Sequence, residues 1–370
     1  MKIKTKFTAA FAATLLSASF LTVNVKAADI DINSQSNSSD KTIQTVETPV
    51  KKVSYFKSNP KIIQLKKETT LYKDAALAHP DHKAKKNYHY LISLLKTNND
   101  GSKILKTNSG LYISADTSLS KKIKGYQNPK KYHQVHYTQL KPYGKVGYTL
   151  SRGYEGIKTW KVMHKMGTWA GTNYYNQATY NAVKNFQRKH GLKVTGSVNL
   201  KTWQKMGFSK KEWYDIDSYV APLGAKAWQD RSGHIEAMIK QAYKYIGKPW
   251  LAGCSSSPAY GVDCSGLVMQ ALYAGGISPE PTSSIGHAHP GNEWNSRNLW
   301  ADKKLKKVSY SSRKRGDLVF YYQPGTHTIW HVAIYLGNNK VIESWPPSVM
   351  VQPIVNGQRN VIAGIKRPFI

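Results

Sequence analysis

Two short motifs place a possible nucleophile and a possible base near the C-terminus of the chain. Cys264 lies in Asp263-Cys264-Ser265-Gly266, and His331 begins the run His331-Val332-Ala333-Ile334-Tyr335-Leu336-Gly337. The residues after Cys264 predict a helix that ends at Gly275-Gly276, so Cys264 is expected at a helix N-terminus. The N–H groups and the helix dipole there stabilise a thiolate and can lower a cysteine pKa from about 8.5 toward neutrality. Because a histidine near this thiol could take its proton, the motifs predict a thiol hydrolase.

The residues after His331 predict a β-hairpin. Residues 332–336 are rich in strand formers, Gly337-Asn338-Asn339 is a turn sequence, and residues 340–344 form the returning strand. If the loop has three residues, Glu343 lies diagonally from His331 on one face of the sheet and could hold the imidazole in position. A two-residue loop would send Glu343 to the opposite face. The sequence leaves both registers open.

Cys264 also has explanations other than catalysis. A lone cysteine is more often a small buried apolar residue than a nucleophile. Cys254 is the only other cysteine, and a disulfide between the two would disarm the nucleophile. A zinc site is disfavoured because the nearby cysteines and histidines lack CxxC or HExxH spacing.

The stretch from about His234 to Ile370 resembles the NlpC-type cell-wall cysteine peptidases, which are papain-like. The resemblance implies an α+β fold, with Cys264 as nucleophile, His331 as base and Glu343 in the place of the third, imidazole-orienting residue. It also implies cleavage of a γ-D-glutamyl to diamino-acid bond in peptidoglycan stem peptides. The matching motifs occur in the family's order and spacing, and they are Tyr245-Ile246-Gly247-Lys248-Pro249-Trp250, Asp263-Cys264-Ser265-Gly266-Leu267-Val268, Gly276-Ile277, Gly316-Asp317-Leu318-Val319-Phe320 and the run that begins at His331.

Three further residues concern the substrate. Asp263 is expected to cap the helix that begins at Cys264, and the resemblance implies that Asp263 and Ser265 hold the free amine of a stem peptide. Trp250 replaces the tyrosine usual in the family, so an indole that can only donate a hydrogen bond stands in for a hydroxyl. No cofactor is expected, because Cys264, His331 and a backbone oxyanion donor such as the Cys264 N–H suffice to form and hydrolyse a thioester.

The N-terminal residues predict export. At 370 residues the chain is long enough for two or three domains. Residues 1–27 combine early lysines with an apolar stretch, which is typical of a cleaved secretory signal. Residues 28–60 are rich in small polar and charged residues and predict a flexible spacer. No later segment has 18 uninterrupted apolar residues, so we expect no transmembrane segment and a secreted, cell-wall-associated protein.

The charge predicts a polyanionic partner. The chain has 54 Lys and Arg against 21 Asp and Glu, a formal net charge of +33. Nucleic acid would suit this charge, but an exported protein meets the anionic polymers of the wall. Diffuse lysine excess fits adhesion to such polymers better than base recognition, so we expect anionic wall polymers and no nucleic acid as partners.

Two modules are predicted ahead of the peptidase domain at residues 233–370, and together they predict a multidomain chain. Residues 61–142 alternate short apolar clusters with turn residues and lysines, which indicates a β-rich wall-attachment module that loosely resembles surface-layer-type anchoring repeats. A folded spacer without a ligand fits this region equally well. Residues 148–208 resemble a small three-helix peptidoglycan-binding domain, through a helix motif that begins at Thr179, its expected N-cap, and through Thr202-Trp203. Residues 209–232 are predicted to be a linker.

The features together predict a secreted peptidoglycan endopeptidase whose wall-binding modules raise the effective concentration of substrate. Two alternatives remain. One is an N-acetylmuramoyl-L-alanine amidase-type thiol hydrolase, which cuts between glycan and stem peptide with the same chemistry. The other is a catalytically silent cell-wall-binding protein in which Cys264 is oxidised.

Overall fold

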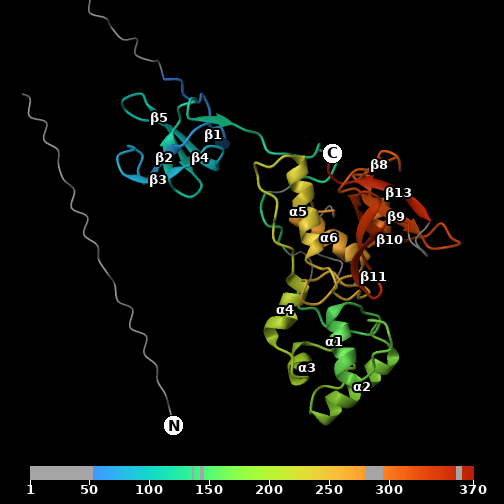
Figure 1. The fold of residues 1–370 in the computed structure, drawn as a ribbon. Helices are drawn as coiled ribbons and strands as arrows, with labels where there is room; N and C mark the ends of the chain where they lie inside the picture. The colour runs from blue at the N-terminus through green and yellow to red at the C-terminus, as the bar shows by residue number, and fades with distance from the viewer. Residues whose placement is uncertain (1–52, 136, 142–145, 280–294, 356–360) are drawn as a thin grey trace, which may run out of the picture. The chain divides into compact units, whose positions relative to one another are not determined.

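The computed structural model describes residues 53–135, 137–141, 146–279, 295–355 and 361–370 (Figure 1). The predicted secretory signal and most of the predicted spacer lie outside these residues. Residues 53–60 were assigned to the spacer, but Tyr55 and Phe56 pack against the core of the N-terminal sheet, and the Phe56 N–H donates to the Ala115 carbonyl (3.2 Å). Among the described residues, no helix is both long and apolar enough to cross a membrane.

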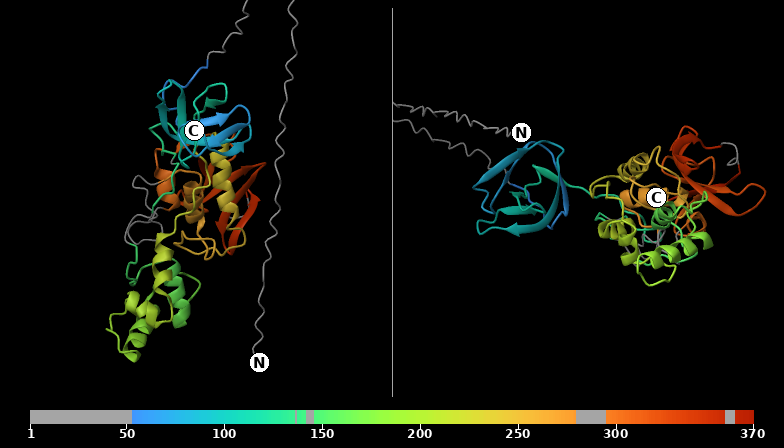
Figure 2. Two further views of the ribbon diagram at one scale, coloured as in Figure 1. Left: turned by 90° about the vertical axis from the view of Figure 1, so that its left-hand side faces the viewer. Right: turned by 90° about the horizontal axis from the view of Figure 1, so that it is seen from below.

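The N-terminal region forms one antiparallel sheet with the strand order β3-β2-β6-β5-β4-β1-β7. Alternate residues of the strands point inward, so Ile63 and Leu65 of β1 are fully buried while their neighbours are partly exposed. Figure 2 shows the strands curling around this interior. The β-rich prediction is confirmed, although the last strand ends at Lys122. The strands are β1 (Ile62–Leu65), β2 (Thr69–Tyr72), β3 (Pro80–Ala84), β4 (His89–Thr97), β5 (Lys103–Thr107), β6 (Tyr112–Ser114) and β7 (Ser120–Lys122).

The segment after β7 packs on the C-terminal domain, although the sequence assigned it to the β-rich module. Val135 forms a bridge with Ile277 and is 2% exposed within the C-terminal core. The buried His133 contacts the carboxylate of Asp302 through Nε2. This segment is therefore held by tertiary contacts with the C-terminal domain and not by the N-terminal sheet.

Four helices follow, namely α1 (Ile157–Met166), α2 (Gln177–Lys189), α3 (Leu200–Lys205) and α4 (Lys210–Ser218). The predicted cap of α2 was wrong: Asn176 caps the helix by accepting from the Thr179 N–H (2.8 Å), so Thr179 lies inside the first turn. Helix α4 lies within the predicted linker. It folds because Trp213 and Ile216 are buried in the same cluster as Val183 of α2. The three-helix architecture remains a prediction.

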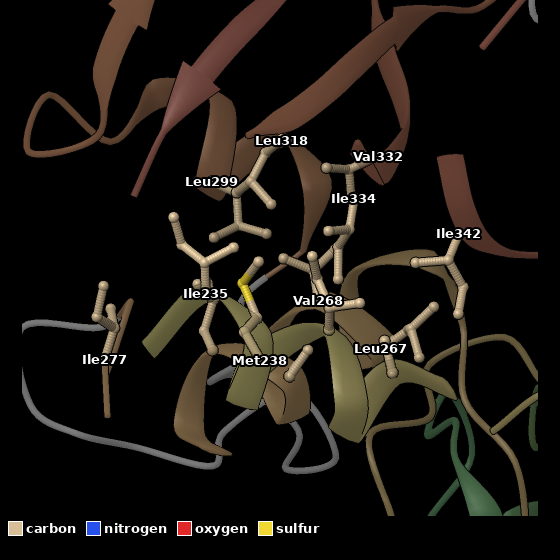
Figure 3. Packing of buried hydrophobic residues seen from close by; sticks show 14 of the residues in the cluster. Ile235, Met238, Leu267, Val268, Ile277, Leu299, Leu318, Val332, Ile334 and Ile342 are labelled. Atoms are coloured by element: carbon tan, nitrogen blue, oxygen red, sulfur yellow. The ribbon is translucent and has the colours of Figure 1, made fainter. Parts of the chain in front are cut away.

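In the C-terminal domain, helices pack against an antiparallel sheet with the strand order β12-β11-β10-β9-β13-β8. Ile235 and Met238 of one helix and Val268 of another meet Val332 and Ile334 of the sheet in the core (Figure 3). This confirms the predicted mixture of helix and sheet. The elements are α5 (Arg231–Tyr243), α6 (Cys264–Ala274), α7 (Ser296–Ala301), β8 (Lys306–Val308), β9 (Leu318–Tyr322), β10 (Ile329–Gly337), β11 (Lys340–Trp345), β12 (Ser348–Pro353) and β13 (Ile362–Arg367).

Candidate active site

Helix α6 begins at Cys264 and presents this residue at its first turn. Asp263 is the N-cap, as predicted, and its Oδ1 accepts from the Gly266 N–H at 2.8 Å. A short carboxylate suits this position because it reaches a backbone N–H that has no partner within the helix. The helix ends at Gly275, also as predicted. The rest of α6 is buried, so the helix holds Cys264 in a fixed place.

The hairpin of β10 and β11 brings Glu343 to His331 by a route that the sequence did not predict. Its loop has two residues, Asn338-Asn339, both with positive φ (51° and 55°), and Gly337 pairs with Lys340. We expected such a loop to send Glu343 to the other face. A bulge between Tyr335 and Gly337 adds one residue to β10, however, and restores the shared face.

The result is a buried pair between His331 and Glu343. The distance from His331 Nε2 to Glu343 Oε2 is 2.6 Å, and the two residues are 1% and 0% exposed. Gln352 donates through Nε2 to the other oxygen of Glu343. The rings of Tyr321 and Trp345 lie beside the imidazole, with centroids 5.4 Å and 4.9 Å away. These contacts fix the ring and direct Nε2 toward the carboxylate, so Nδ1 is the nitrogen left for chemistry with a thiol.

The surroundings of Cys264 differ from the expectation of a lowered pKa. Burial, with a smaller effect from the charge of Asp263, raises the pKa of the Cys264 thiol to about 12. Hydrogen bonds from the backbone N–H groups of Val332 and Ser265 act in the opposite direction but are weaker. At neutral pH the resting thiol is therefore protonated and needs a base. Since Val332 follows His331 directly, these contacts also place the sulfur beside the histidine's strand.

A pocket of about 510 Å³ surrounds these groups. Cys264 and His331 both line it, together with three residues singled out from the sequence: Trp250, Asp263 and Ser265. Glu343 lies behind His331 and is not part of the pocket wall. The Ser265 hydroxyl donates to Asp263 Oδ1 (3.1 Å). The structure thus brings all six predicted site residues into one region.

The two cysteines are both free thiols, so the structure contains no Cys254–Cys264 disulfide. Cys254 is fully buried, and burial raises the pKa of its thiol strongly. Cys264 is partly exposed toward the pocket. Of the two thiols, Cys264 is therefore the one that a molecule in the pocket can reach.

Several pocket residues were missed in the sequence. Trp330 and Trp345 flank the histidine and could have been found by extending the hairpin, because both lie within two residues of a predicted site residue. Arg297 of α7 and Glu155, which immediately precedes Gly156, the N-cap of α1, gave no local signal. Only the tertiary structure brings them to Cys264. The pocket as a whole combines a thiol, an oriented base and charged side chains, which suits nucleophilic acyl transfer on a polar substrate.

Comparison with known proteins finds three family matches along the chain. Residues 241–360 match the NlpC/P60 family. Residues 164–206 match the model of a peptidoglycan binding domain, and residues 55–119 match a domain of unknown function, DUF5776.

Three curated relatives are similar to parts of this chain. The chain is 36% identical to murein DD-endopeptidase MepH of Escherichia coli (strain K12) over 106 residues, which are 29% of this chain and 34% of that protein. It is 29% identical to peptidoglycan endopeptidase RipA of Mycolicibacterium smegmatis over 121 residues, 30% of this chain and 21% of RipA. It is also 29% identical to gamma-D-glutamyl-L-lysine dipeptidyl-peptidase of Bacillus subtilis (strain 168) over 139 residues, 37% of this chain and 41% of that protein. The matched region spans less than half the length of each relative.

Proposed function

We propose that this protein is a secreted peptidoglycan hydrolase that cleaves stem peptides between γ-D-glutamate and a diamino acid. The observation that carries the proposal is the buried His331–Glu343 pair beside Cys264, at the start of a helix, in a single pocket. The names of the relatives support peptidoglycan as the substrate. The name of the Bacillus subtilis relative supports the γ-D-glutamyl bond.

Each catalytic step has a group in the pocket. The Cys264 sulfur attacks the γ-carbonyl carbon while His331 Nδ1 takes the thiol proton, because the thiol is neutral at rest. The Cys264 N–H at the start of α6 is the proposed donor to the developing oxyanion. The imidazolium, stabilised by Glu343, then gives its proton to the departing amine. A water molecule, deprotonated by His331, hydrolyses the thioester and returns the thiol.

The test is mass spectrometry of muropeptides released from purified walls by the mature protein under reducing conditions. We expect fragments cut after γ-D-glutamate from the wild type and none from Cys264→Ala. Glu343→Gln keeps the size of the side chain but removes the charge, so we expect its kcat to fall by at least about 100-fold. Fragments cut between glycan and stem peptide would favour the amidase-type alternative. Wall binding without new fragments would favour the silent wall-binding protein.

A further inference from the structure

One face of the N-terminal sheet carries a row of side chains that crosses four neighbouring strands. Tyr72 of β2 pairs with Tyr112 of β6, and Tyr112 pairs with Lys106 of β5. Lys106 in turn pairs with Leu94 of β4. Directly opposed residues project from the same face of a sheet, and neighbouring strands lie about 4.8 Å apart, so the row is about 14 Å long. We call these four residues the tyrosine–lysine row.

The tyrosine–lysine row lies on the outer face of the curled sheet. Leu105, which precedes Lys106, is fully buried in the interior. Because successive side chains of a strand point to opposite faces, the row points outward. Tyr72, Tyr112 and Lys106 are partly exposed, and Leu94 is 47% exposed. Lys106 Nζ lies 5.4 Å from the centre of the Tyr112 ring, so a cation and an aromatic ring lie side by side on this face.

A hollow of about 460 Å³ adjoins the row. It lies between the loop after β2 and the loop that joins β4 to β5, and it is lined by Lys96, which shares the outer face of β4 with Leu94. Asn98 holds the two loops together, because its Nδ2 donates to the Ala75 carbonyl (3.2 Å) and to the Ser102 hydroxyl (3.3 Å). The hollow is therefore preformed, and it places a lysine, an amide and a hydroxyl beside the row.

The composition of the sheet indicates the chemistry of a partner. Residues 61–122 contain 12 lysines and no arginine, against five acidic residues. The lysine ammonium binds phosphate as a point charge, whereas bidentate recognition of planar groups favours arginine. A tyrosine on a surface offers an apolar ring and a polar hydroxyl, and the apolar C–H faces of sugar rings pack on such rings. The combination fits a polymer that carries both sugars and phosphates.

We infer that the tyrosine–lysine row and the adjoining hollow bind a glycosylated phosphodiester polymer of the cell wall. Sugar rings stack on Tyr72 and Tyr112, and phosphate groups pair with Lys96 and Lys106. The amide and the hydroxyl of the hollow bind sugar hydroxyls. This inference goes beyond the proposed peptidase reaction and does not depend on it. It assigns the N-terminal sheet a defined site, which differs from adhesion by diffuse charge.

The experiment measures calorimetric binding of the full chain, carrying Cys264→Ala, to glycosylated poly(ribitol phosphate), to the same polymer without sugars and to neutral dextran. Tyr72→Ala/Tyr112→Ala should weaken binding of the glycosylated polymer roughly 5- to 50-fold, because two stacking contacts are lost. Binding of the sugar-free polymer should change little, which also shows that this variant is folded. Lys96→Gln/Lys106→Gln should weaken binding of both phosphate polymers about 3- to 30-fold at about 0.15 M salt. Dextran should bind much more weakly than either.

The matched controls lie on the same sheet but outside the row. Lys85, Lys86 and Tyr88 are exposed in the connection between β3 and β4, and Tyr88 is 58% exposed. Lys85→Gln/Lys86→Gln and Tyr88→Ala should bind all three polymers as the parent protein does.

Three results would overturn the inference. The first is unchanged binding of the glycosylated polymer to the tyrosine variant. The second is an equal loss for the row lysines and the control lysines, which would indicate diffuse charge alone. The third is that neither phosphate polymer binds the parent protein. The comparison of the two lysine variants decides the question even if the tyrosine variant does not fold. Since no hydrolysis is measured, these outcomes are independent of whether the wild type cleaves stem peptides.

Discussion

Glu343 sets the orientation of His331 through one short hydrogen bond in a water-excluded site. Its second oxygen is held by Gln352, and the ring is flanked by Tyr321 and Trp345, so neither partner can turn independently. In the proposed mechanism, a carboxylate in this place also stabilises the imidazolium that forms when His331 takes a proton. The thiol needs this help because the pKa of Cys264 is raised to about 12.

The raised pKa leads to a prediction about alkylation. Iodoacetamide reacts with the thiolate, and below its pKa the thiolate fraction of Cys264 grows about tenfold per pH unit. We expect the alkylation rate of the full-length protein to rise continuously from about pH 7 to about pH 10. Mass spectrometry of the Cys264 peptide measures the rate, and the buried Cys254 provides an internal control that should stay unlabelled while the protein is folded. A plateau near pH 7 would contradict this and indicate a preformed thiolate–imidazolium pair.

At the scale of elements, helices α1 and α4 are joined by a fully buried ion pair. Lys158 Nζ lies 2.7 Å from Asp217 Oδ2, and both side chains are 0% exposed. The ammonium also lies over the rings of Tyr148 and Trp213, 3.9 Å and 3.7 Å from their centroids. Burial lowers the pKa of Lys158 to about 8 and raises that of Asp217 to about 6, so desolvation outweighs the attraction within the pair.

Breaking this pair should be costly. Asp217→Asn removes the counter-charge, so Lys158 must either stay charged in a buried site or give up its proton, and we expect the free energy of unfolding to fall by about 3–5 kcal/mol. Scanning calorimetry of the full chain measures the loss. Lys211→Ala, which removes an exposed pair with Asp215 on the same helix, is the control and should change little. A stability equal to that of wild type would contradict the assigned role of the pair.

At the scale of the whole molecule, the charge of +33 dominates long-range interactions. The wall of the pocket is mixed instead, because Glu155 and Asp263 line it together with Arg297. Charge-driven adhesion is sensitive to salt, because the Debye length shrinks from about 8 Å at 0.15 M to about 3 Å at 1 M.

Wall binding should therefore weaken strongly as salt rises. Sedimentation of Cys264→Ala with purified walls, at 0.15 M and at 1 M sodium chloride, measures the bound fraction without digestion. We expect most of the protein to be released at high salt, and walls stripped of anionic polymers to bind less at low salt. Binding that is unchanged at 1 M salt would show that contacts other than charge hold the protein to the wall.

The sequence by itself determined the features that depend on neighbouring residues. The helix that begins at Cys264, its Asp263 cap and its end at Gly275 follow from local hydrogen bonding and apolar spacing, and all three are present in the structure. The β-rich character of the N-terminal region follows from its short apolar clusters and turn residues. The mixed fold of the C-terminal domain was implied by the resemblance of its motifs to a known family, and it is also present.

Only the tertiary structure decided the features that depend on distant contacts. The bulge between Tyr335 and Gly337 sets the register that places Glu343 beside His331. The length of the hairpin loop, whether two or three residues, does not predict this bulge. Helix α4 was predicted to be part of a linker, and the segment around Val135 was assigned to the β-rich module. Both pack as they do because other parts of the chain bury their apolar residues. Glu155 reaches the pocket for the same reason. These apolar residues are buried by contacts between segments far apart in the chain. A local sequence pattern therefore cannot predict which charged side chain such contacts place beside Cys264.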